Sequence, residues 1–421
     1  MIEKLLHTPE GVRDIYDREC KRKVLLERRL QQLLELYGYR QIQTPMFEFF
    51  DIFNHEKGTI SSKEMYKFFD RDNNTLVLRP DMTPSIARCV AQYYGEEQEP
   101  IRLSYKGSTF INNSRYQGKL KETTQLGCEL INDDSSDADA EVLAMAIHCL
   151  KEAGLTEFQV SIGQVEFFRG LMKEAGLSKE SEEQIRIAIE TKNYFAVSNL
   201  IDSTNMDSSI ANVLLQFQEL YGGLEILEKA KQLAKNVTSM KAIERLEKVY
   251  NTLTYYGVED AVSFDLGMLS QYQYYTGIIF KGYTYGTGDA IVKGGRYDDL
   301  LTQFGKNAPS IGFAIVIDEL VMALSRQKLQ QKLEDTNTLI LYQENSGEKA
   351  IKLATNFRSQ GLVIELLHKS PEKDLEYYKD YASNHHIGGM LYLQDDGKIQ
   401  VIHMGDGSVQ ILESNEFLKG M

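Results

Sequence analysis

The sequence predicts an α+β protein in which a mixed, mainly antiparallel sheet is flanked by helices, with a helical insertion and a smaller C-terminal α/β domain. Three observations predict it. Short β-rich runs separated by Gly-containing turns lie on both sides of a charge-rich stretch with helical periodicity at about 165–255. After a polar segment at 330–337, strand and helix patterns alternate as βαβαβ. We therefore expect a core at 1–326, interrupted by the insertion at about 165–255, and a second domain at 336–421.

The N-terminal half of the core is expected to hold two amphipathic helices and several strands. A helix at about 15–37 has its leucines on one face, and Gly38 follows where a C-cap belongs. Its basic stretch KRKVLLERR, at 21–29, then falls on the solvated face. The elements expected next are an extended segment at 40–50, strands at 75–80 and 101–107, a helix at 137–153 and a strand at 158–163.

After the insertion the sheet is expected to resume. The β-rich runs are AVSFDLGML at 261–269, YYTGIIFKGYTY at 274–285 and DAIVKGG at 289–295, followed by a strand and a helix at 311–326. The C-terminal domain is expected to contain strands at 337–343, 362–368 and 388–394, with helices at 348–361 and 372–382.

Composition limits the class of protein. With 421 residues, 42% of them hydrophobic, the chain can bury sizeable cores. A formal net charge of −14 argues against a nucleic-acid binder driven by phosphate neutralisation, although a local basic groove would be compatible with it. The N-terminus has no signal-peptide pattern, and no run of apolar residues is long enough to span a membrane. We therefore expect a cytoplasmic protein that does not enter a membrane.

The four cysteines show no metal-ligand or redox spacing. Cys20, Cys89, Cys128 and Cys149 lie far apart, with no CxxC pair and no His/Cys pattern. We expect reduced, buried thiols, no metal site and no cofactor.

Seven motifs occur in order along the core. They are GVRD at 11–14, GYRQIQTPMFE at 38–48, LRPDMT at 78–83, the segment at 106–130, YYTGIIF at 274–280, GGRYDDL at 294–300 and IGFAIVIDEL at 311–320. Together they resemble the motifs of histidyl-tRNA synthetase, from near the N-terminus to about residue 325. The resemblance implies a class II aminoacyl-tRNA synthetase-like core, and implies in outline that the C-terminal domain is similar to an anticodon-binding domain.

The cations that this family uses to activate an amino acid with ATP are missing. The reaction needs cations that hold the triphosphate and stabilise the charge developing on it. The resemblance places Ile111 and Ser270 where arginines belong, and Asp318 with Glu319 where a Glu-Arg pair belongs. Thr123 replaces the aromatic residue expected to stack on adenine. Each lost cation costs on the order of a hundredfold or more in rate, so we do not expect aminoacylation.

The sequence therefore resembles more closely the catalytically silent paralogue of the synthetase, the regulatory subunit of short-form ATP phosphoribosyltransferase. This resemblance implies a non-catalytic subunit that joins a catalytic subunit, supports its activity and helps histidine inhibit the first step of histidine biosynthesis. The segment at 38–48 resembles the dimer motif of class II synthetases and implies a homodimeric building block.

Two alternatives come from other classes. The first is a divergent but active histidyl-tRNA synthetase, which the missing arginines argue against. The second is a synthetase-like domain that binds RNA or senses uncharged tRNA. The stretch at 337–421 holds 12 Asp and Glu against 8 Lys and Arg, which argues against a tRNA-binding surface.

The resemblance also implies a histidine-binding pocket. Free histidine needs a carboxylate for its ammonium and polar partners for its imidazole. The expected residues are Asp81 and Thr83 at the ammonium, Gln125 and Glu129 along the amino-acid site, and Tyr275 and Tyr297 near the ring.

Each of these assignments has a purely structural alternative. Asp81 replaces the family's usual Glu and could be a turn residue, and Thr83 could be a helix N-cap before Pro84. Gln125 and Glu129 share one face of a predicted strand, and a buried carboxylate without a partner is costly, which favours a ligand role. Tyr274 and Tyr275 should alternate faces, with Tyr275 toward the pocket. In the motif at 294–300, Arg296 and Asp298 could simply brace a turn.

Overall fold

The computed structural model describes residues 6–53, 60–113, 119–204, 206–269 and 274–413. Contacts divide the chain into two compact units, Met1–Gln330 and Gln331–Met421. Each unit is described by itself below.

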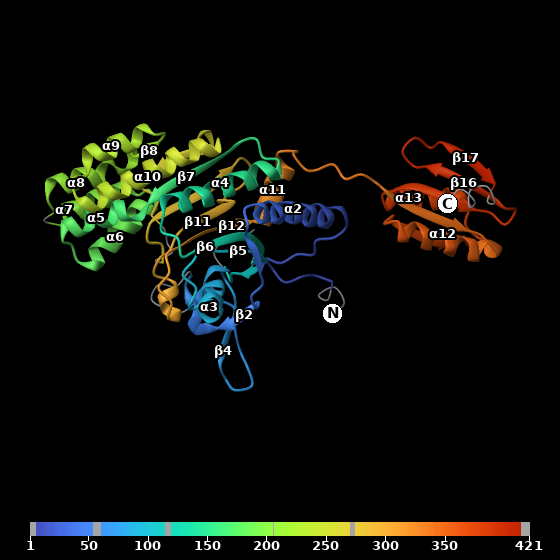
Figure 1. The fold of residues 1–421 in the computed structure, drawn as a ribbon, viewed down its shortest axis with the longest axis horizontal. Coiled ribbons are helices and arrows are strands. Elements are labelled where there is room, and N and C mark those ends of the chain that lie inside the picture. The colour runs from blue at the N-terminus through green and yellow to red at the C-terminus, as the bar shows by residue number, and fades with distance from the viewer. Residues whose placement is uncertain (1–5, 54–59, 114–118, 205, 270–273, 414–421) are drawn as a thin grey trace. The chain divides into compact units, whose positions relative to one another are not determined.

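The larger unit is built on a nine-stranded sheet (Figure 1). Its strands are β1 (Arg40–Ile42), β5 (Ile101–Phe110), β6 (Glu122–Ile131), β7 (Phe158–Gln164), β8 (Tyr221–Gly222), β9 (Val262–Asp265), β10 (Ile278–Thr284), β11 (Val292–Arg296) and β12 (Ser310–Val316). They lie in the order β1-β5-β6-β12-β11-β10-β7-β9-β8. The pairs β1–β5 and β7–β9 are parallel and the other pairs are antiparallel, which confirms the predicted mixed, mainly antiparallel sheet.

One face of this sheet is apolar and covered by helices. The covering helices are α2 (Asp17–Leu36), α4 (Ser136–Ala153), α5 (Val165–Ala175), α10 (Val237–Tyr256) and α11 (Ile317–Arg326). Alternate side chains such as Leu126, Phe280 and Phe313 point into this core, because successive residues of a strand face opposite sides. Among them, α2 and α4 confirm the helices predicted at about 15–37 and 137–153.

The residues between β7 and β9 are mainly helical. Besides α5 and α10 they form α6 (Lys179–Glu190), α7 (Tyr194–Asp202), α8 (Ser208–Leu215) and α9 (Glu225–Leu233). Figure 1 shows these helices gathered at the β8 end of the sheet. The side chains of Ser178, Asn193, Asp207 and Asn236 accept backbone N–H bonds at the starts of four of them, which explains where these helices begin.

The opposite face of the sheet carries a row of small and polar residues. Strand register places them directly opposite one another, from β6 to β9, in the order Gly127, Ala314, Lys293, Lys281, Ser161 and Ser263. Two lysines therefore face each other across neighbouring antiparallel strands. This face has room for ligands, because several of its positions carry small side chains or none.

A smaller, three-stranded sheet lies beside α3 (Thr83–Tyr93). Its strands are β2 (Phe47–Phe49), β3 (Lys67–Phe69) and β4 (Thr75–Leu78), in the order β2-β4-β3. The predicted extended segment at 40–50 is thus split between two sheets: β1 joins the large one and β2 the small one. Pro45 lies between them, and a proline cannot donate to a strand ladder.

The smaller unit is a five-stranded sheet with two helices. Its elements are β13 (Asn337–Tyr342), α12 (Gly347–Ser359), β14 (Ile364–His368), α13 (Leu375–Asn384), β15 (Ile387–Leu393), β16 (Lys398–His403) and β17 (Val409–Glu413). The strand order is β14-β13-β15-β16-β17, with β13 parallel to both neighbours. The first five elements alternate as the sequence predicts, and an antiparallel pair, β16 and β17, extends the sheet beyond that prediction.

Short 3-10 helices complete the described structure: η1 (Phe50–Ile52), η2 (Ser62–Glu64), η3 (Gln216–Glu219), η4 (Glu259–Ala261), η5 (Leu301–Phe304) and η6 (Glu344–Ser346). In the described ranges no helix combines the length and apolar character that crossing a membrane requires. All four cysteines are free; Cys128 and Cys149 are buried as expected, whereas Cys20 and Cys89 are half-buried.

Candidate functional site

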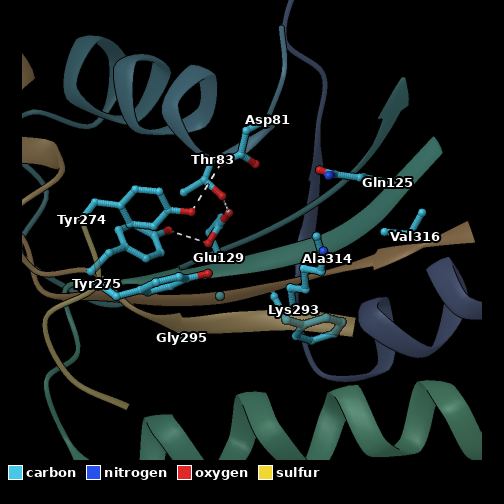
Figure 2. A pocket seen from close by; sticks show the side chains of 13 residues that line it. Asp81, Thr83, Gln125, Glu129, Tyr274, Tyr275, Lys293, Gly295, Ala314 and Val316 are labelled. Atoms are coloured by element: carbon cyan, nitrogen blue, oxygen red, sulfur yellow. Dashed lines mark hydrogen bonds between the residues drawn. The ribbon is translucent and has the colours of Figure 1, made fainter. Parts of the chain in front are cut away.

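A small cavity lies on the polar face of the large sheet. Its volume is about 40 Å3. The residues lining it are Asp81, Thr83, Gln125, Glu129, Tyr274, Tyr275, Lys293, Gly295, Tyr297, Gly312, Phe313, Ala314 and Val316. Figure 2 shows most of these side chains converging from α3, the strands of the sheet and the segment before β10. All six residues predicted from the sequence line this one cavity.

Glu129 is the buried acid of this cavity. Its side chain comes from β6 and is only 1% exposed. Thr83 donates its hydroxyl hydrogen to Oε1 at 2.8 Å, and Tyr297 donates to Oε2 at 2.5 Å. Burial raises the pKa of Glu129 to about 8, against the opposing effect of these two hydroxyl bonds, and the nearby Asp81 carboxylate raises it further. Near neutral pH, burial therefore favours the protonated form of this carboxyl.

Asp81 and Thr83 reach the cavity at the start of α3. The carboxylate of Asp81 accepts the backbone N–H groups of Met82 and Thr83 and the hydroxyl of Tyr274, the last at 3.4 Å. Asp81 thus has a turn-stabilising role as well as a place in the cavity. The N-cap position is Met82, so the interpretation of Thr83 as an N-cap is wrong: its hydroxyl is bonded to Glu129 instead.

Gln125 and Lys293 form the polar side of the cavity away from α3. Gln125 and Glu129 both lie on β6, at positions separated by an even number of residues, and both face the cavity. The buried Oε1 of Gln125 has no hydrogen-bond partner among the described residues. Lys293 rises from β11 beside Ala314 (Figure 2) and is the single cationic side chain among the described residues that line the cavity. Within the described part of the chain, Lys293 pairs with the half-exposed Asp289, at 3.4 Å.

Both tyrosines of the pair at 274–275 line the cavity, so the prediction that they alternate between core and pocket is wrong. The reason is that β10 begins only at Ile278, and strand alternation does not apply before it. The two rings lie on the same side, with centroids 4.7 Å apart. Tyr274 also packs edge-on against Tyr297, at 5.9 Å between centroids.

Two glycines make room for these side chains. A Cβ on Gly312 would lie 1.7 Å from Oε2 of Glu129, and a Cβ on Gly295 would lie 2.7 Å from the ring of Tyr275. Neither position could carry a larger residue without displacing a cavity wall. Lys293, Gly295 and Gly312 were not among the residues predicted to bind a ligand. Lys293 and Gly295 are two residues apart on β11 and share a face for that reason.

Arg296 and Asp298 brace the frame around the cavity and not merely a turn, which was the structural alternative for them. Arg296 is buried and bonds through Nε and Nη2 to the fully buried Asp139 of α4, at 2.8 and 2.7 Å. Arg245 of α10 bonds the other oxygen of Asp139 at 2.6 Å. Asp298 accepts the hydroxyl of Thr276 and the backbone N–H of residue 310. The network ties β11, α4 and α10 together behind the tyrosine that contacts Glu129.

The basic stretch at 21–29 is only partly solvated, contrary to expectation. Lys23 pairs with Asp318 at 2.6 Å, and both side chains are largely buried. Asp318 also accepts the backbone N–H of Thr124, at 2.6 Å, at the end of β6 that holds Gln125. Glu27 is buried and pairs with Lys106 at 3.0 Å. Helix α2 is therefore fixed to the sheet by ion pairs as well as by its apolar face.

The positions that would contact ATP in the synthetase pattern are uncharged or acidic where the structure describes them. Ile111 follows β5, and Thr123 bonds Thr109 across the strand pair at 3.2 Å. Glu319 lies in the first turn of α11, and burial raises its pKa, with the neighbouring Asp289 adding to the effect. Ser270 lies outside the described residues.

Comparison with known proteins places this chain in a family. A family model described as histidyl-tRNA synthetase matches residues 11–320. A protein of Acetivibrio thermocellus named ATP phosphoribosyltransferase regulatory subunit is 40% identical over 419 residues, covering 100% of both chains. A protein of Ruminiclostridium cellulolyticum with the same name is 39% identical, covering 94% of each chain.

Solved structures agree with these relatives. A Bacillus halodurans protein described as an ATP phosphoribosyltransferase regulatory subunit/histidyl-tRNA synthetase is 32% identical, with a TM-score of 0.83, covering 93% of this chain and 98% of that one. Histidyl-tRNA synthetase from Nostoc shares the fold, with a TM-score of 0.80 at 17% identity over 99% of each chain. The relatives' names agree with the prediction of a non-catalytic role. The chain therefore belongs to the family of ATP phosphoribosyltransferase regulatory subunits, and its fold is that of the class II histidyl-tRNA synthetases.

Proposed function

We propose that the chain assembles with the catalytic subunit of a short-form ATP phosphoribosyltransferase, supports its activity in the first step of histidine biosynthesis, and binds histidine as the feedback effector. The assignment of histidine as the ligand rests on the buried carboxyl of Glu129, which accepts hydrogen bonds from Thr83 and Tyr297 in a cavity that Asp81 also lines. Two adjacent carboxyl groups in a buried place favour a ligand that brings positive charge or N–H donors.

Histidine has complementary groups for each side of this cavity. Its ammonium and imidazole N–H groups match the acceptors Asp81 and Glu129, together with the unpartnered Oε1 of Gln125. Its carboxylate matches Lys293, the cation on the far side. The rings of Tyr275 and Tyr297 supply the flat walls that an imidazole can pack against.

The cavity must open to admit an amino acid. Its volume of about 40 Å3 is enough for a few water molecules and smaller than histidine. Tyr274 and Tyr275 precede β10, which begins at Ile278, so their rings can shift without breaking strand pairing. Histidine would then bind one conformation of the subunit better than another. Such a difference in affinity is what a regulatory subunit needs in order to pass a signal to its partner.

An exposed apolar patch on the small sheet supports the proposed homodimer. Phe47 and Phe49 of β2 are both more than half exposed, although they are large and apolar. They share a face of the sheet with Phe68 of β3, because Phe49 and Phe68 both pair with the same residue of β4, and the rings of Phe47 and Phe68 pack edge-on. Patches of this kind mark protein interfaces. We propose that two copies of the chain pair through it, in keeping with the dimer motif at 38–48.

A binding experiment tests the ligand assignment. We expect calorimetric titration of histidine into the full complex to give a clear isotherm, and the Glu129→Ala and Gln125→Ala complexes to bind at least roughly tenfold more weakly, because each loses a buried hydrogen-bonding group. Glu122→Ala, an exposed change on the same strand, is the control. Unchanged affinity and inhibition in both cavity variants would place the histidine site elsewhere.

An activity assay separates this proposal from the alternative of a divergent synthetase. With Ile111, Thr123 and Glu319 at the positions described above, we expect no histidine-dependent pyrophosphate exchange above a no-enzyme blank. The acidic balance of residues 337–421 gives no support for a tRNA-binding role.

A further inference from the structure

A second cavity lies on the polar face of the large sheet, nearer to the helices that follow β7. Its volume is about 350 Å3, far more than that of the cavity around Glu129, and the two share no lining residue. It is lined chiefly by Gln159, Ser161, Glu190, Lys192, Asp265 and Lys281. A volume of this size lies in the range of sites that bind small molecules.

Lys281 is the unusual residue of this second cavity. Strand register places it between Lys293 of β11 and Ser161 of β7, so its side chain projects from the polar face next to another lysine. Like charges directly opposite on neighbouring strands are destabilising. The Lys281 ammonium has no hydrogen bond or ion pair within the described part of the chain. Burial lowers the pKa of Lys281, and Lys293 lowers it further, while the carboxylates of Glu190, Asp289 and Asp265 raise it.

The acidic residues of the second cavity are already paired with other cations. Lys192 bonds both carboxylate oxygens of Asp265, at 3.1 and 2.9 Å. Glu190 pairs with Arg186 of α6 at 2.8 Å. The charged side chains of the described lining balance in number, two lysines against two carboxylates, but both carboxylates are bonded to other cations and Lys281 is left without a direct partner. A half-buried charge without a partner is costly, and a bound anion would remove the cost.

The neighbouring polar groups suit an oxyanion. Ser161 offers a hydroxyl, which shares a hydrogen bond with Ser263 at 3.0 Å. Gln159 lies two residues earlier on the same strand, so it projects from the same face and offers a side-chain amide. A lysine ammonium acts as a point-charge partner for phosphate. We propose that this second cavity binds a small phosphorylated metabolite through its phosphate group, with Lys281 as the principal cation and Ser161 and Gln159 as donors. The remaining volume would hold the organic part of the ligand.

The proposal is tested on the full-length chain with inorganic phosphate as the probe. Melting temperature and calorimetric binding are measured with phosphate, with acetate and with chloride at equal ionic strength. We expect phosphate to stabilise the wild type and Lys281→Arg, and to bind Lys281→Met at least roughly tenfold more weakly, because one charge-assisted bond is lost. Lys352→Gln, at an exposed helix position paired with Glu348, is the matched control and should respond as the wild type does.

A separate measurement distinguishes loss of phosphate binding from a loss of stability caused by replacing Lys281. In phosphate-free buffer, Lys281→Met should melt at or above the temperature of the wild type, because it removes a half-buried unpaired charge. A wild type without any response to phosphate would overturn the proposal. So would a Lys281→Met variant that keeps the full response, or an equal response to acetate. Lys281→Gln gives the same test if the methionine variant does not fold. No histidine or catalytic subunit is present, so the outcome is independent of the function proposed above.

Discussion

Tyr297 donates a hydrogen bond to Glu129 at 2.5 Å, and both side chains are almost completely removed from solvent. The acceptor lies on β6 and the donor directly follows β11, two strands that are separated by β12 in the sheet. Gly312 of β12 lies between them, and its missing side chain leaves the space that the carboxyl occupies. The site therefore depends on three strands together, and the ionisation of Glu129 is linked to the stability of the fold.

The first prediction concerns this ionisation. The folded-state pKa of Glu129 is about 8, raised above the ordinary carboxyl value of 4.5. Between those two values the folded chain binds more protons than the unfolded chain, so the contribution of Glu129 to stability falls as pH rises. We expect the free energy of unfolding of the wild type, relative to Glu129→Gln, to drop by roughly 3 kcal/mol between pH 5 and pH 8. Chemical denaturation at several pH values measures it.

Glu122→Gln is the matched control for that experiment, because Glu122 is exposed at the start of the same strand. Its stability should follow the wild type at every pH. Parallel profiles for the wild type and Glu129→Gln would contradict the prediction, since they would mean that Glu129 titrates in the folded chain as it does in the unfolded one.

The second prediction concerns the buried ion network behind the site. Asp139 is fully buried between Arg296 and Arg245. Replacing it with Ala leaves two guanidinium groups without their shared partner, and breaking a buried pair in this way costs about 3–5 kcal/mol. We expect Asp139→Ala to lose about that much stability in urea denaturation. Glu348→Gln, which breaks a fully exposed pair, should cause no measurable change, and an equally small effect of Asp139→Ala would show that the network adds nothing.

Local periodicity was a reliable guide to which residues of β6 share a face. The shared face of Gln125 and Glu129 follows from strand alternation, and the structure places both in one cavity. The same rule failed at Tyr274 and Tyr275, because strand pairing starts three residues later. Sequence alone shows where alternation applies only if the ends of the strand are known, and those ends depend on neighbouring strands.

Contacts between segments far apart in the chain could not be predicted from the sequence. Lys23 has helical spacing typical of a solvated position, and it is buried only because Asp318, 295 residues away, lies beneath it. Lys281 and Lys293 are separated by a turn, and their direct opposition depends on the register of β10 against β11. Register is fixed by the whole sheet, so neither the pair nor the second cavity could be predicted from the motifs.

The third prediction concerns self-association. The apolar patch on β2 and β3 includes Phe47 and Phe49, which are 52% and 56% exposed. If two copies pair through it, a charge placed there must be buried without a partner, which opposes association. We expect the double variant Phe47→Asp, Phe49→Asp to be monomeric in light scattering while the wild type is dimeric. Phe195→Asp, at a phenylalanine on α7 that is 79% exposed, should remain dimeric, and a double variant that also stays dimeric would exclude this patch as the interface.

The fourth prediction concerns how the site would distinguish histidine from related cations. Asp81, Glu129 and Gln125 offer acceptors for the ammonium and the imidazole, and histamine carries both groups. It lacks the carboxylate, whose proposed partner is Lys293. A charge-assisted hydrogen bond is worth about 1.5–3 kcal/mol, so the wild-type complex should bind histidine roughly tenfold or more tightly than histamine in competition calorimetry.

Lys293→Gln should bring the two affinities together by weakening histidine binding alone. Lys119→Gln provides the matched control, because Lys119 also pairs with Asp289, at 3.2 Å, but does not line the cavity. That control should keep the preference for histidine. If Lys293→Gln weakened the binding of histidine and of histamine equally, the lysine would act through the stability of the fold or through the electrostatic potential of the cavity, and not through a bond to the carboxylate. If it weakened neither, the carboxylate of histidine would have to lie toward another part of the site, and the orientation of the ligand proposed here would be reversed.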